Sequence, residues 1–315
     1  MMSALLHLTL ALSIGQPGQP DVDREWILAP QLSPGLELVY SGISTEETIG
    51  TSVTRSYRLQ NHVLILGSEG KVSDVAFMTT LAVRDPNQTA KIAPSSIRLE
   101  FAKVDNQGRM KPLPGSTLHP PVAAPPIVET SCFVEAPPVR VGRGASWDVA
   151  EEGQPPRSWL IQGTEACGGS PCVKLLGQQQ SDDWDRPRAD CAAWRRRDVV
   201  WLSLQSGIAV KVERTVERRD PAHREPSHRT LTSYTLESRL RYPNKLFDDR
   251  KQEILLAHRV MTDTADFLKQ ATGDPARLDA LLRKVAYHLQ NRPSTPYRVA
   301  LEHAVERVDH AKRGE

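Results

Sequence analysis

The stretch from Ser158 to Tyr242 contains five segments in which apolar and polar side chains alternate: SWLIQGTEA (158–166), CVKLLGQQQ (172–180), DVVWLSL (198–204), IAVKVERTVER (208–218) and RTLTSYTLESRLRY (229–242). Alternation with a period of two residues is typical of strands that bury one face. We therefore expect a run of long antiparallel strands. The rest of the chain adds strands before this stretch and helices after it.

The clearest hairpin joins the third and fourth segments through Gln205-Ser206-Gly207. A two-residue loop, Ser206-Gly207, would place Trp201 opposite Val212. A three-residue loop with Gly207 in the left-handed conformation is favoured, because a shift of one residue would move a whole apolar set to the wrong face. This loop predicts one shared face for Val200, Leu202, Leu204, Ile208, Val210 and Val212. In the fifth segment the predicted packed face contains Tyr234, Leu236, Leu240 and Tyr242.

Residues 26–109 are predicted to form a first β-rich block, a four-stranded meander whose strands include Leu36–Tyr40, Tyr57–Ile65, Val75–Val83 and Ile97–Phe101. Residues 110–156 are rich in proline, which cannot donate to a strand ladder. We expect an extended connector there, with at most a short edge strand around Ile127 to Val134. It is either a plain spacer or a docking segment for an aromatic-lined groove. The second β-rich block covers residues 157–243, and the sequence leaves open whether the two blocks form one sheet.

After Pro243 the apolar residues recur every three or four positions, which indicates amphipathic helices. Residues 244–312 are predicted to form three helices. Gly273 ends the first, Asp274 and Pro275 begin the second, and Thr295 and Pro296 begin the third. The predicted fold class is α+β: an antiparallel meander, open or half-barrel-like, followed by a C-terminal three-helix region.

The N-terminus has a short apolar run from Ala4 to Ser13, followed by polar sequence. It resembles a secretory signal peptide, with Ala11-Leu12-Ser13 as the cleavage site, although no Lys or Arg precedes the run. We assign residues 1–20 to it and expect a periplasmic or secreted protein. The alternative is an apolar start on a cytosolic protein. The run is too short to span a bilayer.

Composition narrows the range of partners. The 315 residues have a formal net charge of +2, and aromatic residues make up 5%. Neither value favours nucleic-acid binding. The run Arg195-Arg196-Arg197 is flanked by Asp190 and Asp198, and we interpret it as a solvated strand entry. His223 and His228 lie in a polar loop and are not expected to bind a metal.

The four cysteines suggest disulfides if the protein is exported. A four-residue loop, Gly168 to Pro171, would place Cys167 directly opposite Cys172 and Glu165 opposite Lys174. We predict a structural Cys167–Cys172 disulfide. A redox-active dithiol is the alternative, but the spacing differs from the C-x-x-C motif. Cys132 and Cys191 could form a second disulfide, although four cysteines allow three connectivities.

Catalytic motifs do not stand out. The chain has no G-x-S-x-G, H-E-x-x-H or G-x-x-x-x-G-K sequence. The cluster Asp182-Asp183-Trp184-Asp185 lacks the spacing of a calcium loop. We therefore predict no catalytic residues, no cofactor and no metal.

The pattern W-L-I-Q-G-T-E at 159–165, followed by C-V-K-L-L-G at 172–177, resembles the long curved hairpins of exported β-rich bacterial proteins of uncharacterised function. More distantly, it is similar to the half-barrel lipoprotein-carrier class, in which an open antiparallel sheet holds an acyl chain beneath helices. The resemblance covers about the middle third of the chain and includes no diagnostic motif. This sequence departs from the carriers because its helices come last and the proline-rich connector interrupts the sheet. No carrier residues are transferred.

Three functional hypotheses follow. The leading one is an exported, non-enzymatic β-sheet protein that binds an unidentified protein or envelope partner or acts as a scaffold. The second is a carrier of an apolar or lipid ligand, which requires an uncovered, apolar concave face. The third is a thiol-based or hydrolytic enzyme, which requires polar groups with perturbed pKa values converging in a pocket.

Overall fold

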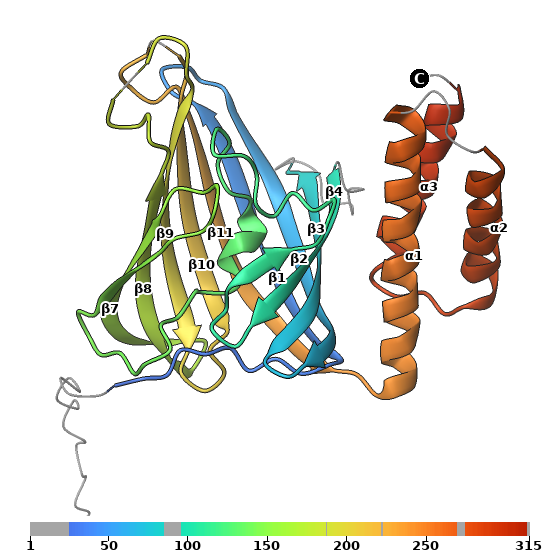
Figure 1. Cartoon of the computed structure of the whole chain (residues 1–315), viewed down its shortest axis with the longest axis horizontal. Helices are drawn as coiled ribbons and strands as arrows, with labels where there is room; N and C mark the ends of the chain where they lie inside the picture. Colours follow the sequence, from blue (N-terminus) through green and yellow to red (C-terminus); the bar gives the residue numbers. More distant parts are fainter. Residues whose placement is uncertain (1–24, 85–95, 187, 222, 270–274, 314–315) are drawn as a thin grey trace, which may run out of the picture.

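One curved sheet forms most of the molecule, and three helices lie beside it (Figure 1). The computed structural model describes residues 25–84, 96–186, 188–221, 223–269 and 275–313. The predicted signal peptide at residues 1–20 lies outside the described residues. The predicted fold class is confirmed, because an open antiparallel sheet precedes a three-helix C-terminal region.

The eleven strands are ordered β5-β4-β3-β2-β1-β11-β10-β9-β8-β7-β6, so each strand except β1 and β11 lies between its sequence neighbours or at an edge. Pairing of β1 with β11 joins the two β-rich blocks into one sheet. The strand bounds are Leu36–Thr48 (β1), Thr54–Glu69 (β2), Val72–Val83 (β3), Ser96–Asp105 (β4), Met110–Pro112 (β5), Ser146–Val149 (β6), Arg157–Cys167 (β7), Ser170–Gln180 (β8), Ala193–Ser203 (β9), Ala209–Arg219 (β10) and His228–Arg241 (β11).

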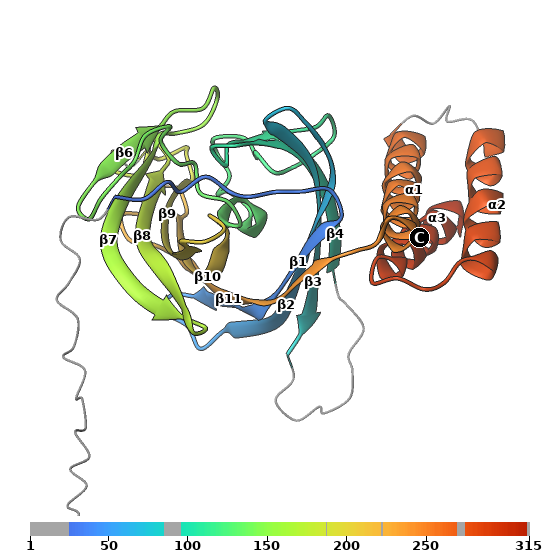
Figure 2. The same cartoon turned by 90° about the horizontal axis from the view of Figure 1, so that it is seen from below.

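The concave face of the sheet is covered by residues 113–145, which we call the insert (Figure 2). No strand forms at Ile127 to Val134, where the sequence allowed at most a short edge strand. A short 3-10 helix, η1 (Val128–Ser131), forms instead, and the Thr130 hydroxyl donates to the Ile127 carbonyl at 2.7 Å. The insert is more than a spacer, because it buries apolar side chains in the main core: Leu118, Cys132, Phe133, Val134, Ala136 and Val141.

In the β9–β10 hairpin, one residue, Val210, does not lie on its predicted face. Val200 pairs with Val212, and Leu202 pairs with Ala209, because a bulge between Ala209 and Lys211 removes Val210 from the buried set. The Ser203 amide donates to the Ile208 carbonyl at 2.9 Å, so the loop has four residues rather than the predicted three. Gly207 adopts the left-handed conformation as predicted, with φ of 61°.

A second bulge, opposite Val39 and Tyr40, changes the predicted face of β11. Tyr234 and Leu236 pack in the concave core. Beyond the bulge, Tyr242 packs with the helices, and Leu240 is 44% exposed. The prediction of one face for all four residues was therefore wrong, because an extra residue in one strand reverses the side-chain alternation after it.

The helices α1 (Asn244–Lys269), α2 (Pro275–Asn291) and α3 (Arg298–Arg313) pack together on the convex side, against β2–β4. Their buried stripes meet side chains that point away from the concave core, including Leu64, Met78 and Phe101. α2 begins at Pro275 as predicted, whereas Gly273 and Asp274 lie outside the described residues. The Thr295 hydroxyl accepts from the Tyr297 amide at 3.1 Å, which is the predicted capping interaction before α3.

Candidate functional site

A buried ion cluster holds the insert against the concave face. Asp198 on β9 accepts from Arg196 Nε at 2.7 Å and from Arg214 Nε at 2.9 Å. Arg157 on β7 pairs with Glu135 of the insert, which also accepts from Trp159 Nε1 at 3.1 Å. Each of the five charged side chains is at most 5% exposed. Their mutual contacts are what make burial of so much charge tolerable.

The insert contacts both halves of the open sheet, one containing β10 and the other β4. The Arg214 guanidinium donates to the Ile127 carbonyl and, at 3.1 Å, to the Thr130 hydroxyl. Across the concavity, the fully buried Glu129 carboxylate lies 3.4 Å from Arg98 Nε on β4. The 3-10 helix η1 therefore connects the two halves of the sheet. Among the described residues, the apolar side chains of the concave core are buried together with those of the insert, whereas the carrier hypothesis requires an uncovered apolar face.

The prediction that Arg195-Arg196-Arg197 is a solvated strand entry was wrong for the middle residue. Arg196 is 2% exposed, and Asp198 is 1% exposed. Both share the concave face of β9 with Val200 and Leu202, so charged residues continue the alternation of a buried face. The sequence therefore contained a signal for this cluster, because charged residues at the buried positions of a strand need partners. Some of those partners must come from another segment.

All four cysteines are free thiols in the structure. The predicted register was wrong, because Cys167 pairs with Ser170 and Glu165 pairs with Cys172. Gly168 and Gly169 form a two-residue turn with positive φ values, which matches the twist of a tight hairpin better than a four-residue loop. The Cys167–Cys172 disulfide stays a prediction.

Cys132 and Cys191 are likewise free thiols, and their pairing stays a prediction. Cys132 lies in the concave core, where Asn61 Nδ2 contacts its sulfur at 3.1 Å. Burial raises the pKa of the Cys132 thiol to about 12, so little of the nucleophilic thiolate forms at neutral pH.

An open cleft of about 1060 Å³ lies between the convex face of β1–β3 and the start of α3. Its apolar lining includes Ile43, Met78, Ala82 and Val299. Its charged lining consists of Arg58, Arg84, Glu237, Arg298 and Glu302, with His62 beside them. None of these residues was singled out from the sequence, because they come from five elements, β1, β2, β3, β11 and α3, that only the fold brings together.

The positive charges of the cleft are only partly neutralised. Among the described residues, Arg58 and Arg84 form no ion pair. Arg298 is held in place, since its guanidinium donates to the carbonyls of Leu289 and Arg292, each at 3.1 Å, and lies 3.5 Å from buried Glu253. Glu237 accepts from the Ser41 hydroxyl. The cleft therefore combines apolar surface with two guanidinium groups, those of Arg58 and Arg84, that no described carboxylate neutralises.

A buried hydrogen-bond cluster closes the back of the cleft. Glu37, 1% exposed, accepts from the Tyr297 hydroxyl at 2.6 Å and from the Tyr242 hydroxyl, and its Oε1 lies 3.0 Å from His62 Nδ1. Burial alone would raise the pKa of Glu37, but the hydrogen bonds from His62, Tyr242 and Tyr297 hold that pKa below its ordinary value. Burial and the bond to Glu37 raise the pKa of Tyr242 to about 12.

Replacing Glu37 by glutamine is expected to lower the free energy of unfolding by about 1–3 kcal/mol at pH 7, because hydrogen bonds to a charged acceptor are lost. Since the pKa of Glu37 is lowered in the folded state, its contribution is present above the pKa of the unfolded chain, about 4.3, and is lost as the pH falls. Urea denaturation of both proteins at pH 7 and near pH 4 measures this. Glu46→Gln, an exposed change on the same strand, is the control. A loss equal to the control at pH 7 would contradict the prediction.

The other polar groups noted in the sequence lie elsewhere. Trp184, from the acidic cluster 182–185, contacts Arg195 and Arg219, whose guanidinium carbons are 4.7 Å and 5.2 Å from its ring centre. His228 is exposed on β11 and lies 3.9 Å from Asp220. Among the described residues, no three His, Cys, Asp or Glu side chains converge in a metal-binding group.

Comparisons with known proteins show only distant likeness. No protein-family model and no curated protein sequence matches the chain. A DUF1329 family protein from Desulfovibrio piger matches with a TM-score of 0.22 and 10% identity, over 64% of this chain and 85% of that chain. Lipovitellin matches with a TM-score of 0.34 and 10% identity, over 68% of this chain and 26% of that chain.

An outer membrane lipoprotein-sorting protein domain from Vibrio parahaemolyticus matches with a TM-score of 0.19 and 12% identity, over 68% of this chain and 90% of that chain. The distant resemblance to lipoprotein carriers suggested by the sequence is matched here only by weak structural likenesses, and they carry no functional argument. In the part of the chain that the structure describes, no helix is long and apolar enough to cross a membrane.

Proposed function

We propose that the chain is an exported binding protein and that its ligand is an amphiphilic anion, a molecule with an apolar body and a carboxylate or phosphate group. The observation that supports this most directly is the cleft on the convex face. It is open, and beside apolar side chains such as Met78 and Val299 it places Arg58 and Arg84, which form no ion pair with a described residue. The proposal of export rests on the apolar sequence near the N-terminus.

The ligand class follows from the lining of the cleft. Guanidinium groups bind carboxylates and phosphates through paired N–H donors, and they keep their charge at any physiological pH. Apolar walls favour a hydrocarbon or ring system, since burying such surface contributes roughly 25 cal/mol per Å². A cavity of this size is at the upper end of those that hold small molecules. A fatty acid has both parts.

The cleft differs from the site that the carrier hypothesis assumed. That hypothesis placed an apolar ligand in the concave sheet, where the insert and its ion cluster now lie. An apolar or lipid ligand remains the proposed class, but on the convex side, under the start of α3. This location needs no movement of the insert.

Oleate binding, measured by displacement of anilinonaphthalene sulfonate fluorescence, tests the proposal. Arg58→Ala is expected to weaken oleate binding roughly fivefold to tenfold, because one charge-assisted hydrogen-bonding partner is lost. It should leave binding of the uncharged analogue oleyl alcohol unchanged. Ala82→Phe fills the cleft and should weaken both ligands. Arg55→Ala, on the same strand but outside the cleft, is the matched control.

Two results would contradict this assignment. One is oleate binding that neither Arg58→Ala nor Ala82→Phe affects. The other is an absence of binding to the natural protein at micromolar concentrations of either ligand.

A further inference from the structure

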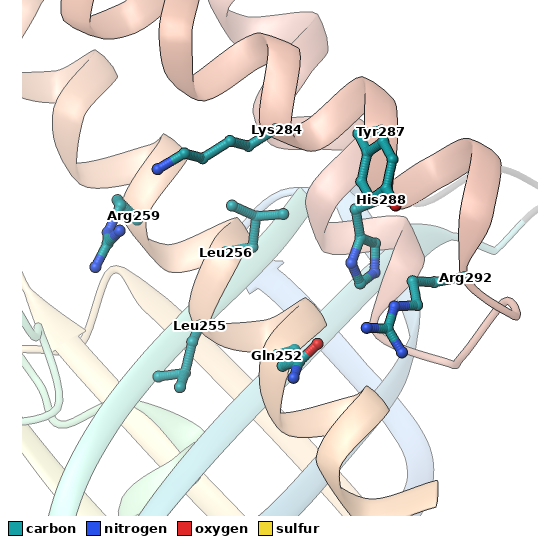
Figure 3. A pocket seen from close by; sticks show the side chains of 8 residues that line it. All are labelled: Gln252, Leu255, Leu256, Arg259, Lys284, Tyr287, His288 and Arg292. Carbon is teal, nitrogen blue, oxygen red and sulfur yellow. The ribbon is translucent and has the colours of Figure 1, made fainter. Parts of the chain in front are cut away.

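A second surface feature is the groove between α1 and α2 (Figure 3). It has a volume of about 350 Å³. α1 contributes positions 252, 255, 256 and 259, and α2 contributes positions 284, 287, 288 and 292. Because these positions step by three and four residues, each helix lines the groove with one continuous face.

The walls of the groove are apolar in the middle. Leu255 is 44% exposed, Leu256 is half-buried, and Tyr287 is 68% exposed. The core-facing residues of the same helices, such as Ile254 and Val285, are almost fully buried. The helices therefore present a second apolar face, which no other described segment covers.

Positive charge gathers at one end of the groove. Arg259 and Lys284 lie together there, on one side of Leu256 in Figure 3, and neither forms an ion pair with a described residue. At the opposite end, Arg292 is already bound to Asp249 at 3.2 Å.

Among the described residues, the acidic side chains near this end are engaged with other partners. Asp263 pairs with Arg277 at 3.0 Å. Glu253 is fully buried beneath the groove, 3.3 Å from His288. A smaller cavity of about 290 Å³ also includes Arg259 and Lys284, so the cationic surface continues past the groove.

We propose that this groove binds an acidic amphipathic helix of a partner protein. Its apolar side chains would pack against Leu255, Leu256 and Tyr287, and a carboxylate would lie between Arg259 and Lys284. Leu255 and Arg259 are four residues apart on one helix, about 6 Å along its axis. The partner's apolar anchor and its carboxylate would therefore also be about one turn apart. A bilayer surface fits less well, because Leu255 and Leu256 line the inside of a groove rather than a ridge.

A fluorescein-labelled synthetic peptide tests the inference. It is an 18-residue helix in which a leucine recurs every seven positions and a glutamate follows each leucine by four. Fluorescence anisotropy should show binding to the natural protein that weakens as salt is added. Lys284→Glu should weaken binding about tenfold or more, because attraction becomes repulsion. Arg283→Glu makes the same change of charge on α2 outside the groove and should leave affinity within about twofold.

A charge-reversed peptide provides an independent test. With lysine in place of glutamate, it should bind the Arg259→Glu, Lys284→Glu double variant more tightly than the natural protein. Equal peptide binding by the natural protein and Lys284→Glu would overturn the inference, and so would equal binding of a scrambled peptide. Binding of phosphatidylglycerol vesicles without peptide binding would assign the groove to a membrane surface instead. Dimerisation that Lys284→Glu abolishes, without peptide binding, would assign it to a second copy of the chain.

Discussion

The Asp198→Asn variant is expected to unfold with a free energy about 3–5 kcal/mol lower than that of the natural protein. Asp198 is the shared acceptor of Arg196 and Arg214, and all three side chains are almost fully buried. An amide in its place leaves two buried guanidinium groups beside each other without the anion that compensates them. Guanidinium chloride denaturation, followed by tryptophan fluorescence, measures the loss.

The pH dependence of this loss has a defined sign. Burial would raise the pKa of Asp198, but the attraction of Arg196 and Arg214 holds it well below its usual range. A group with a lowered pKa contributes stability above the pKa of the unfolded chain, about 3.9 for Asp, and that contribution is lost as the pH falls. The difference between the two proteins should therefore be largest at neutral pH and narrow below about pH 4.

A matched control is available on the protein surface. Asp190→Asn removes a carboxylate that is exposed to solvent and pairs with exposed Arg188. It should leave the denaturation midpoint unchanged, because solvent screens such pairs. If Asp198→Asn shifted the midpoint no more than Asp190→Asn, the ion cluster would not be holding the insert in place.

Much of the sheet could be predicted from local sequence. Leu36, Leu38 and Tyr40 lie on one buried face, as do Val63 and Ile65, because two-residue alternation is a property of each strand alone. The helices were predictable for the same reason, since their apolar stripes and caps are local signals. Strand bulges were not predictable. Those at Tyr40 and Val210 add one residue to a strand, and this moved Tyr242 and Val210 off their predicted faces.

The insert and the cleft could not be predicted because both depend on contacts between distant segments. Proline in residues 110–156 correctly excluded a central strand, but proline does not show whether a segment lies in solvent or in a core. The ion cluster gave a partial signal through Arg196 and Asp198, which occupy buried positions of an alternating strand. The cleft left no signal in the sequence, because Arg58, Arg84 and Arg298 come together only when α3 packs on the sheet.

Replacing Phe133 by alanine is also expected to lower the free energy of unfolding by about 3–5 kcal/mol. Phe133 is fully buried in the insert, and its ring meets that of Phe77 on β3 edge to face, with ring centres 6.2 Å apart. Its loss leaves a cavity between the insert and the concave face. Urea denaturation measures the change in stability, and limited proteolysis shows whether cleavage begins within residues 113–145.

Val139→Ala is the matched control, since Val139 belongs to the same insert but is 61% exposed. A surface change of this kind should alter stability by no more than about 0.5 kcal/mol. A similarly small effect of Phe133→Ala would mean that the insert lies on the sheet as a detachable spacer. The concave face would then be accessible to an apolar ligand, and the carrier hypothesis would regain the site that the structure fills. A large effect makes the insert part of the core, which leaves ligand binding to the convex side.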